Sequence, residues 1–120
     1  YADMWNAFAP APEMKRLGDI LDRHGEAVGR DPRQIERTIM MPLCYTANVD
    51  RQNMVCNIMA MTRQTTPDQV REMVMLGTKQ CLETVERYRK AGVTHFIFMM
   101  FAPYFLDEIQ AFAEEVLPVF

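Results

Sequence analysis

The regular alternation of largely apolar segments with amphipathic ones constrains the fold of this chain most. Three largely apolar segments, residues 1–6, 38–46 and 94–100, have the length of strands, and the last two have apolar residues on both faces. Strands buried on both faces are typical of parallel sheets, and the helices between them supply right-handed crossovers. The sequence therefore predicts an α/β fold with these strands parallel in one sheet.

Three parallel strands alone would leave open edges, whereas a complete (β/α)8 barrel needs about 250 residues. The chain begins with Tyr1 rather than methionine, inside an apolar stretch. We therefore expect residues 1–120 to be the C-terminal portion of a single partial TIM barrel: its last three strands, their helices and a helical insertion. We expect many of the residues that carry chemistry in such a barrel to lie outside residues 1–120, and residues 1–120 alone to be inactive.

Helices are expected at residues 12–29, 48–64, 66–77, 79–91 and 105–117, from apolar residues spaced three and four apart. Thr66-Pro67-Asp68-Gln69 is typical of a helix start, and Gly29 of a helix end. Pro42 lies within an expected strand and predicts a local irregularity there. Residues 50–76 exceed what one strand–helix unit needs, so we expect a lid-like insertion over the carboxyl ends of the strands.

Composition excludes several classes of protein. The net charge is −3 and there is no basic stripe, so we expect no nucleic-acid partner. No apolar run reaches the roughly 18 residues that span a bilayer, so we expect no membrane partner.

The three cysteines lie 12 and 25 residues apart, which fits no zinc or redox motif. We expect reduced thiols, a cytoplasmic location and no metal site. The 11 methionines fit flexible core filling, or alternatively an adaptable apolar substrate pocket.

Several short motifs occur in an order found in one protein family. The motifs are residues 2–6 (Ala-Asp-Met-Trp-Asn), 24–32 (His-Gly-Glu-Ala-Val-Gly-Arg-Asp-Pro), 76–78 (Leu-Gly-Thr) and 91–96 (Ala-Gly-Val-Thr-His-Phe), with a closing helix at 105–120. Together they resemble the bacterial-luciferase-like flavin and deazaflavin oxidoreductases. Met4 stands where that family usually has glycine, and Lys79 where it often has proline.

The resemblance implies an oxidoreductase or monooxygenase that uses a reduced flavin or deazaflavin for hydride transfer or oxygenation of a small organic substrate. The implied cofactor is coenzyme F-420 or FMN, and His95-Phe96-Ile97-Phe98 looks closer to the deazaflavin branch. A different class is also open: a non-catalytic, truncated barrel fragment that self-associates through its open edges as a homo-oligomer. A further alternative is another cofactor-using barrel without flavin.

Active sites of such barrels lie at the carboxyl ends of the strands. This directs attention to Tyr45 and Thr46 and to residues 101–104. The expected substrate-pocket residues are Trp5, Asn6, Phe101 and Tyr104. For Trp5 the alternative is core packing, and for Asn6 it is a cap of the following helix.

Gly77 and Thr78 open a helix, where free N–H groups favour a cofactor phosphate, with simple capping as the alternative. The catalytic residues stay unknown at this stage. His24 and His95 are interpreted as structural, the acidic residues as mainly solvent-facing, and no carboxylate pair suggests an acid–base couple.

Overall fold

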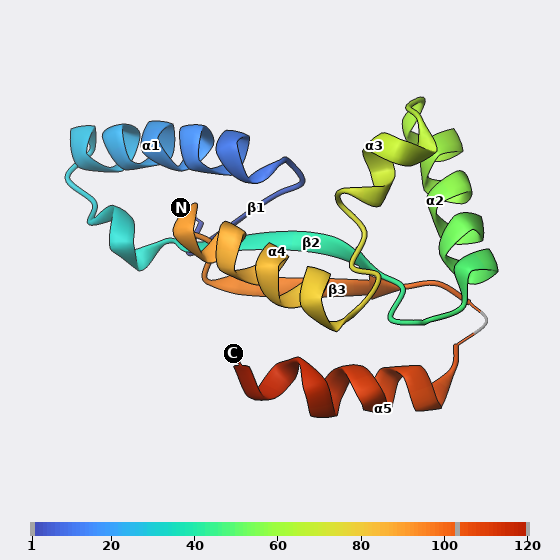
Figure 1. Ribbon diagram of the computed structural model, residues 1–120. Helices are drawn as coiled ribbons and strands as arrows, with labels where there is room; N and C mark the ends of the chain where they lie inside the picture. The colour runs from blue at the N-terminus through green and yellow to red at the C-terminus, as the bar shows by residue number, and fades with distance from the viewer. Residues whose placement is uncertain (1, 103, 120) are drawn as a thin grey trace. The chain divides into compact units, whose positions relative to one another are not determined.

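The computed structural model describes residues 2–102 and 104–119, and Figure 1 follows the chain through its elements. The elements, in chain order, are β1 (Met4–Ala7), α1 (Ala11–Ala27), the 3-10 turn η1 (Pro32–Gln34), β2 (Glu36–Leu43), α2 (Val49–Arg63), α3 (Pro67–Arg71), α4 (Thr78–Lys90), β3 (His95–Met100), α5 (Leu106–Glu115) and η2 (Leu117–Val119). No helix in the described part of the chain is long and apolar enough to cross a membrane.

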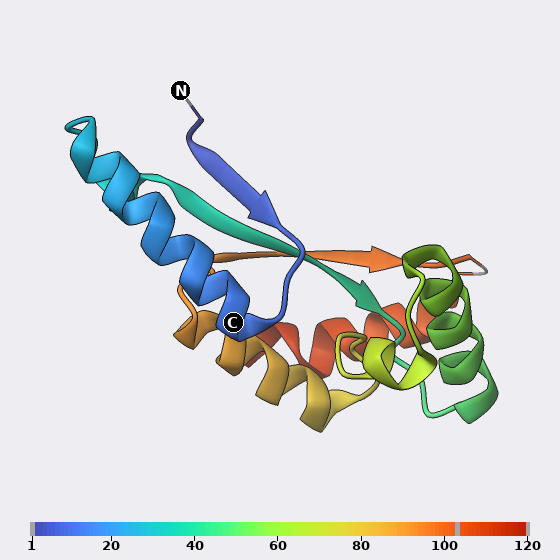
Figure 2. The same ribbon diagram turned by 90° about the horizontal axis from the view of Figure 1, so that it is seen from above.

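The three strands form one sheet in the order β1-β2-β3. β1 pairs with β2 in parallel, with Met4 opposite Glu36 and Ala7 opposite Ile39. The strand arrows in Figure 2 point the same way, as expected for parallel strands joined by helical crossovers. The predicted α/β fold with a parallel sheet is therefore confirmed.

Strand burial agrees with the sequence for β2 but not for β3. β2 carries a run of buried residues that includes Thr38, Ile39 and Met41, as its apolar sequence predicts. β3 is apolar on both faces in the sequence, but its alternate residues His95 and Ile97 are exposed. The described part of the chain leaves those alternate positions uncovered. β2 also runs through Pro42 without interruption.

The chain divides into two compact units, of which unit 1 comprises residues 1–40 and 85–97. Arg37 on β2 forms an ion pair with Asp22 of α1, and its guanidinium occupies the space that a Cβ at Gly18 or Gly92 would approach. The Tyr88 hydroxyl donates a hydrogen bond of 3.0 Å to the carbonyl oxygen of Ala9. These contacts join α1, β2 and the end of α4 within the unit.

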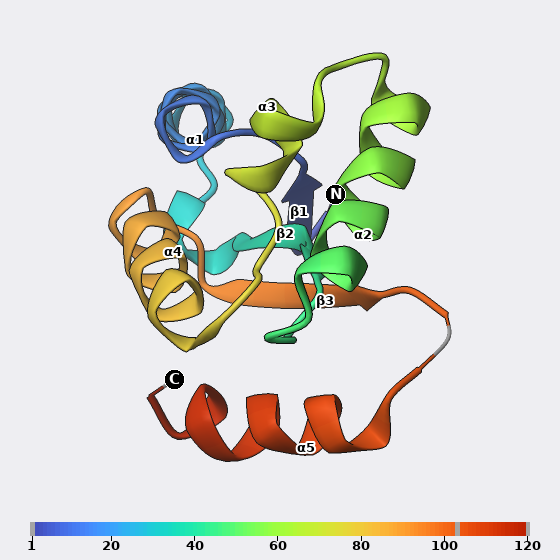
Figure 3. The same cartoon turned by 45° about the vertical axis from the view of Figure 1, so that its right-hand side comes forward.

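Unit 2 comprises residues 41–84 and 98–120. α2 and α3 pack together, as Figure 3 shows. Buried side chains of these two helices and of the segment that follows α3 form one apolar cluster: Val55, Cys56, Met59, Ala60, Val70, Val74 and Leu76. Cys44, Met99 and Phe101 pack against this cluster from the ends of β2 and β3. The two helices therefore rest on the carboxyl-end residues of the strands. That they form an inserted lid stays a prediction.

The helix expected at residues 66–77 is much shorter than predicted. It begins as expected, since Thr66 and Gln69 form a capping box, but it ends at Arg71. The chain then turns, and the N–H of Met75 donates to the carbonyl oxygen of Pro42 while the N–H of Cys44 donates to that of Met75. This pairing with the end of β2 takes Met75 out of the helix and buries it completely.

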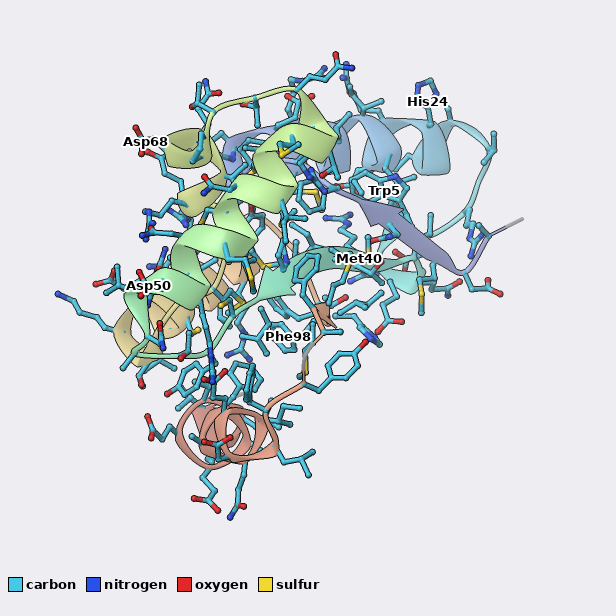
Figure 4. The ribbon with its side chains drawn as sticks, turned by 90° about the vertical axis from the view of Figure 1, so that its right-hand side faces the viewer. Trp5, His24, Met40, Asp50, Asp68 and Phe98 are labelled. Atoms are coloured by element: carbon cyan, nitrogen blue, oxygen red, sulfur yellow. The ribbon has the colours of Figure 1, made fainter. Side chains whose placement is uncertain are left out.

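The ends of α1 and α2 show how local sequence terminates helices. Gly29 follows α1 with φ +73°, and Gln64 ends α2 in the same left-handed region. His24, which is interpreted from the sequence as structural, has an exposed side chain, and Figure 4 shows it pointing away from the strands. The buried face of α1 is formed instead by small and flexible residues: Ala11, Met14, Gly18 and Gly25.

Candidate functional site

An apolar pocket lies in unit 2 where β2 and β3 end. Its cavity volume is about 60 Å³, and it lies between the strand ends, α2 and α5. Its lining residues are Leu43, Cys44, Tyr45, Arg51, Met54, Val55, Met100, Phe101, Ala102, Tyr104, Phe105, Glu108 and Ile109. The carboxyl ends of parallel strands are where ligands bind in α/β proteins. This pocket is therefore the candidate functional site.

Two charged side chains meet inside this pocket wall. Arg51 of α2 forms an ion pair with Glu108 of α5, and their side chains are only 31% and 22% exposed. The Arg51 guanidinium also lies 3.2 Å from the centroid of the Phe105 ring. A guanidinium on an aromatic face gains a cation–π interaction in addition to its carboxylate partner. The pair therefore joins α2 to α5 across the pocket.

A polar cleft adjoins the same strand end. Tyr45 and Glu108 line both the pocket and the cleft. The Tyr45 hydroxyl donates to the Glu115 carboxylate at 2.5 Å, and the Thr78 hydroxyl donates to the same oxygen at 2.7 Å. The two hydroxyls are themselves in hydrogen-bond contact. Three segments, after β2, at the start of α4 and at the end of α5, thus converge on one carboxylate.

This network shifts the acidities of its members. Hydrogen bonds from Tyr45 and then Thr78 lower the pKa of Glu115, because they stabilise its charged form. Burial, followed by the hydrogen bond to Glu115, raises the pKa of Tyr45. At neutral pH the arrangement is therefore an ionised carboxylate that holds two neutral hydroxyl groups in fixed positions.

Gly77 and Thr78, the expected phosphate-binding residues, lie at the start of α4 as predicted. There is open space around Gly77, since nothing lies within 4 Å of an added Cβ. The Thr78 hydroxyl, however, is already bonded to a carboxylate. A phosphate at this helix start would compete with Glu115 for a donor and meet its negative charge, so the residues do not present a ready phosphate site. Binding of phosphate here stays a prediction.

Phe101 and Tyr104 both line the apolar pocket, together with Tyr45. Phe101 is half-buried against the α2–α3 cluster, and Tyr104 is exposed. The structure thus brings two of the four expected substrate-pocket residues together. That substrate binds to them stays a prediction. Pro103, from the same expected segment, lies outside the described residues.

Trp5 and Asn6, the other two expected pocket residues, belong to unit 1. The Thr38 hydroxyl donates to the Asn6 side-chain oxygen at 2.9 Å and also contacts the Trp5 carbonyl oxygen. The alternative that Asn6 caps the next helix is wrong, because the N-cap of α1 is Pro10 and no side chain caps it. Figure 4 shows Trp5 on β1, where it is half-buried. Their contact with substrate stays a prediction.

Sequence reasoning missed Arg51, Glu108 and Glu115 as functional candidates. The two glutamates were assigned to solvent faces, yet each has partners far away in the sequence. One signal was present: positions 108, 112 and 115 recur at four- and three-residue spacing, which places them on one helix face with the buried Phe112. In the described residues no group of three or more His, Cys, Asp or Glu side chains could hold a metal ion.

Comparisons with solved structures match this chain to proteins that share its fold. An F420-dependent secondary alcohol dehydrogenase, in complex with an F420-acetone adduct, superposes on 100% of this chain with a TM-score of 0.80 and 17% identity. A riboflavin lyase, with modified FMN and riboflavin, covers 98% of the chain with a TM-score of 0.66 and 13% identity. A long-chain alkane monooxygenase covers 95%, with a TM-score of 0.61 and 13% identity.

All three are luciferase-like proteins. The chain has the fold of part of a luciferase-like barrel. The predicted resemblance and the predicted partial barrel are thereby confirmed for the fold. The chain spans 44%, 38% and 36% of the lengths of the three neighbours. No protein-family model matches the sequence, and no curated protein does.

Proposed function

We propose that this chain is the C-terminal portion of a luciferase-like oxidoreductase that uses a reduced flavin or deazaflavin on a small organic substrate. The observation that carries the proposal is the apolar pocket at the ends of β2 and β3, in a chain whose fold matches flavin- and F420-dependent neighbours. Residues 50–76 act as the helical insertion that covers this end. We propose a cytoplasmic location for the protein.

In this proposal the bound cofactor supplies hydride transfer or oxygenation, and this chain supplies walls for the substrate. Phe101 and Tyr104 contact the substrate, whose apolar parts gain from leaving water. F-420 and FMN are both compatible with the fold, and the deazaflavin is favoured by the His95-Phe96-Ile97-Phe98 segment of β3. The polar cleft fits a cofactor phosphate poorly because of Glu115, so we assign the phosphate contacts of Gly77 and Thr78 a minor role.

The test compares two proteins: the complete natural protein that contains this chain, and residues 1–120 alone. Each is titrated with F-420 and with FMN while cofactor fluorescence is followed. We expect saturable quenching by one cofactor in the complete protein and none in the 120-residue chain. Failure of the complete protein to bind either cofactor would overturn the proposal. Micromolar binding of a cofactor by residues 1–120 alone would overturn our expectation that most cofactor contacts come from other parts of the barrel.

A second function is favoured by one observation: the two outer strands carry exposed apolar side chains, Met4 on β1 and Ile97 on β3. Exposed apolar strand edges promote pairing with other chains. The 120-residue chain would then be a non-catalytic, self-associating fragment. Light scattering over a concentration series tests this, with Ile97→Lys as the variant expected to weaken association. A monomer at all concentrations would rule the second function out.

A further inference from the structure

We propose that Glu108 sets the charge preference of the apolar pocket, so that the pocket selects uncharged, largely apolar ligands. This inference deepens the proposed function and rests on it only for the identity of the ligand as a substrate. It starts from the composition of the pocket wall. Among its described lining residues only Arg51 and Glu108 carry a formal charge at neutral pH.

The two charges cancel within the wall. Arg51 and Glu108 form a direct ion pair, both side chains are mostly withdrawn from solvent, and Phe105 covers the guanidinium. Screening by salt is weaker for such partly buried pairs than for exposed ones. The pocket therefore offers a ligand no net charge, although it contains an arginine.

This pairing decides between two classes of ligand. Arginine suits a ligand carboxylate by its bidentate geometry, but an anionic ligand would first have to displace Glu108 and leave that carboxylate without its partner. Loss of one member of a partly buried pair is unfavourable, because the remaining charge stays uncompensated. An uncharged ligand leaves the pair intact and gains by burial against apolar residues such as Leu43, Met54 and Met100.

The test uses two probes of the same size, 2-naphthalenemethanol and 2-naphthoate, whose own fluorescence reports binding. Neither probe needs a cofactor, so the measurement holds whether or not the protein binds F-420 or FMN. For the unmodified protein we expect the alcohol to bind at least about tenfold more tightly than the carboxylate. Glu108→Gln frees Arg51 and should shift this ratio toward the carboxylate by on the order of tenfold.

Glu114→Gln is the matched control, because it removes the same charge from α5 at an exposed position bonded to Gln110. It should leave the ratio unchanged. Arg51→Gln provides an independent arm: it leaves Glu108 alone in the wall and should weaken naphthoate binding further, with the alcohol nearly unaffected. Circular dichroism of each variant checks that it is folded.

Three results would overturn the inference. The first is equal affinity of the unmodified protein for the two probes, or no binding of either. The second is a ratio that Glu108→Gln shifts no more than Glu114→Gln does. The third is an Arg51→Gln variant that binds naphthoate more tightly than the unmodified protein. A protein that shows the expected ratios but binds no cofactor would keep this inference and lose the proposed function.

Discussion

The Tyr45 hydroxyl donates a 2.5 Å hydrogen bond to the Glu115 carboxylate, across 70 residues of sequence. Tyr45 follows the end of β2, and Glu115 is the last residue of α5. The Tyr45 ring also packs edge-on against Phe112, one helical turn before Glu115, with ring centroids 5.5 Å apart. A polar and an aromatic contact therefore fix α5 against the strand end that lines the candidate site.

Removal of the Glu115 charge should destabilise the protein in a pH-dependent way. The folded state lowers the pKa of Glu115, so its contribution is present above the ordinary glutamate pKa of about 4.3 and is lost as the pH falls through the lower folded value. We expect Glu115→Gln to unfold at lower urea concentration than the unmodified protein at pH 7. The difference should shrink as the pH falls through the folded value and disappear below it. Glu114→Gln, on the same helix, should change the midpoint little across this pH range.

The sequence predicted correctly those parts of the fold that depend on local patterns of residues. Two of these features depend on residues that are near neighbours in the sequence: the capping box of Thr66 and Gln69, and the glycine after α1. A third, the parallel strand order, depends on the alternation of whole segments. Phe101 and Tyr104 were placed at the candidate site by the rule that ligands bind at the carboxyl ends of strands. That rule needs only the strand boundaries.

The features that sequence did not predict depend on distant partners. Helix α3 stops at Arg71 because Met75 pairs with the end of β2, more than 30 residues away. The pairing of Arg51 with Glu108 joins residues 57 positions apart, and each looks like an ordinary surface charge in its own helix. Side-chain partners of this kind are set by tertiary packing and have no local signature.

The three cysteines should differ sharply in reactivity. Burial raises the pKa of all three thiols, that of Cys81 to about 11, but Cys56 and Cys81 are fully inaccessible whereas Cys44 is half-buried in the pocket wall. Since a reagent must reach the sulfur, we expect native protein at pH 8 to react with a thiol reagent at Cys44 only, and all three thiols to react in denaturant. Native Cys44→Ser should not react. Rapid modification of two thiols in the native protein would contradict this assignment.

Two glycines in the left-handed region should resist substitution to different degrees. Gly29 has φ +73° and open space around it, so Gly29→Ala should cost about 1–2 kcal/mol in unfolding free energy from backbone strain alone. Gly92 has φ +93°, and an added Cβ would lie 3.0 Å from Arg37, which is paired with Asp22. Gly92→Ala should therefore cost more than Gly29→Ala. Equal losses of unfolding free energy in the two variants, measured by urea unfolding, would show that the Arg37 side chain moves away from the added Cβ at no cost.

Variants of three methionines of α2 can distinguish the two interpretations of the methionines, core filling and ligand binding. Met59 is buried, at 3% exposure, within the α2–α3 cluster, whereas Met61 is 81% exposed. Met59→Ala should lower the unfolding free energy by about 2–5 kcal/mol, because it removes buried contacts and leaves a cavity. Met61→Ala should change it by less than about 0.5 kcal/mol. Urea unfolding of both variants measures these differences.

Met54 should behave unlike either of them. It lines the pocket and is 42% exposed, so its thioether has few contacts to lose on truncation but offers apolar surface to a ligand. We expect Met54→Ala to retain nearly full stability while it weakens binding of 2-naphthalenemethanol severalfold, since a buried methylene contributes about 0.8 kcal/mol. Met61→Ala is the control for that binding measurement. Unchanged affinity in Met54→Ala would leave core filling as the function of the methionines of α2 and would remove Met54 from the ligand-contacting surface of the pocket.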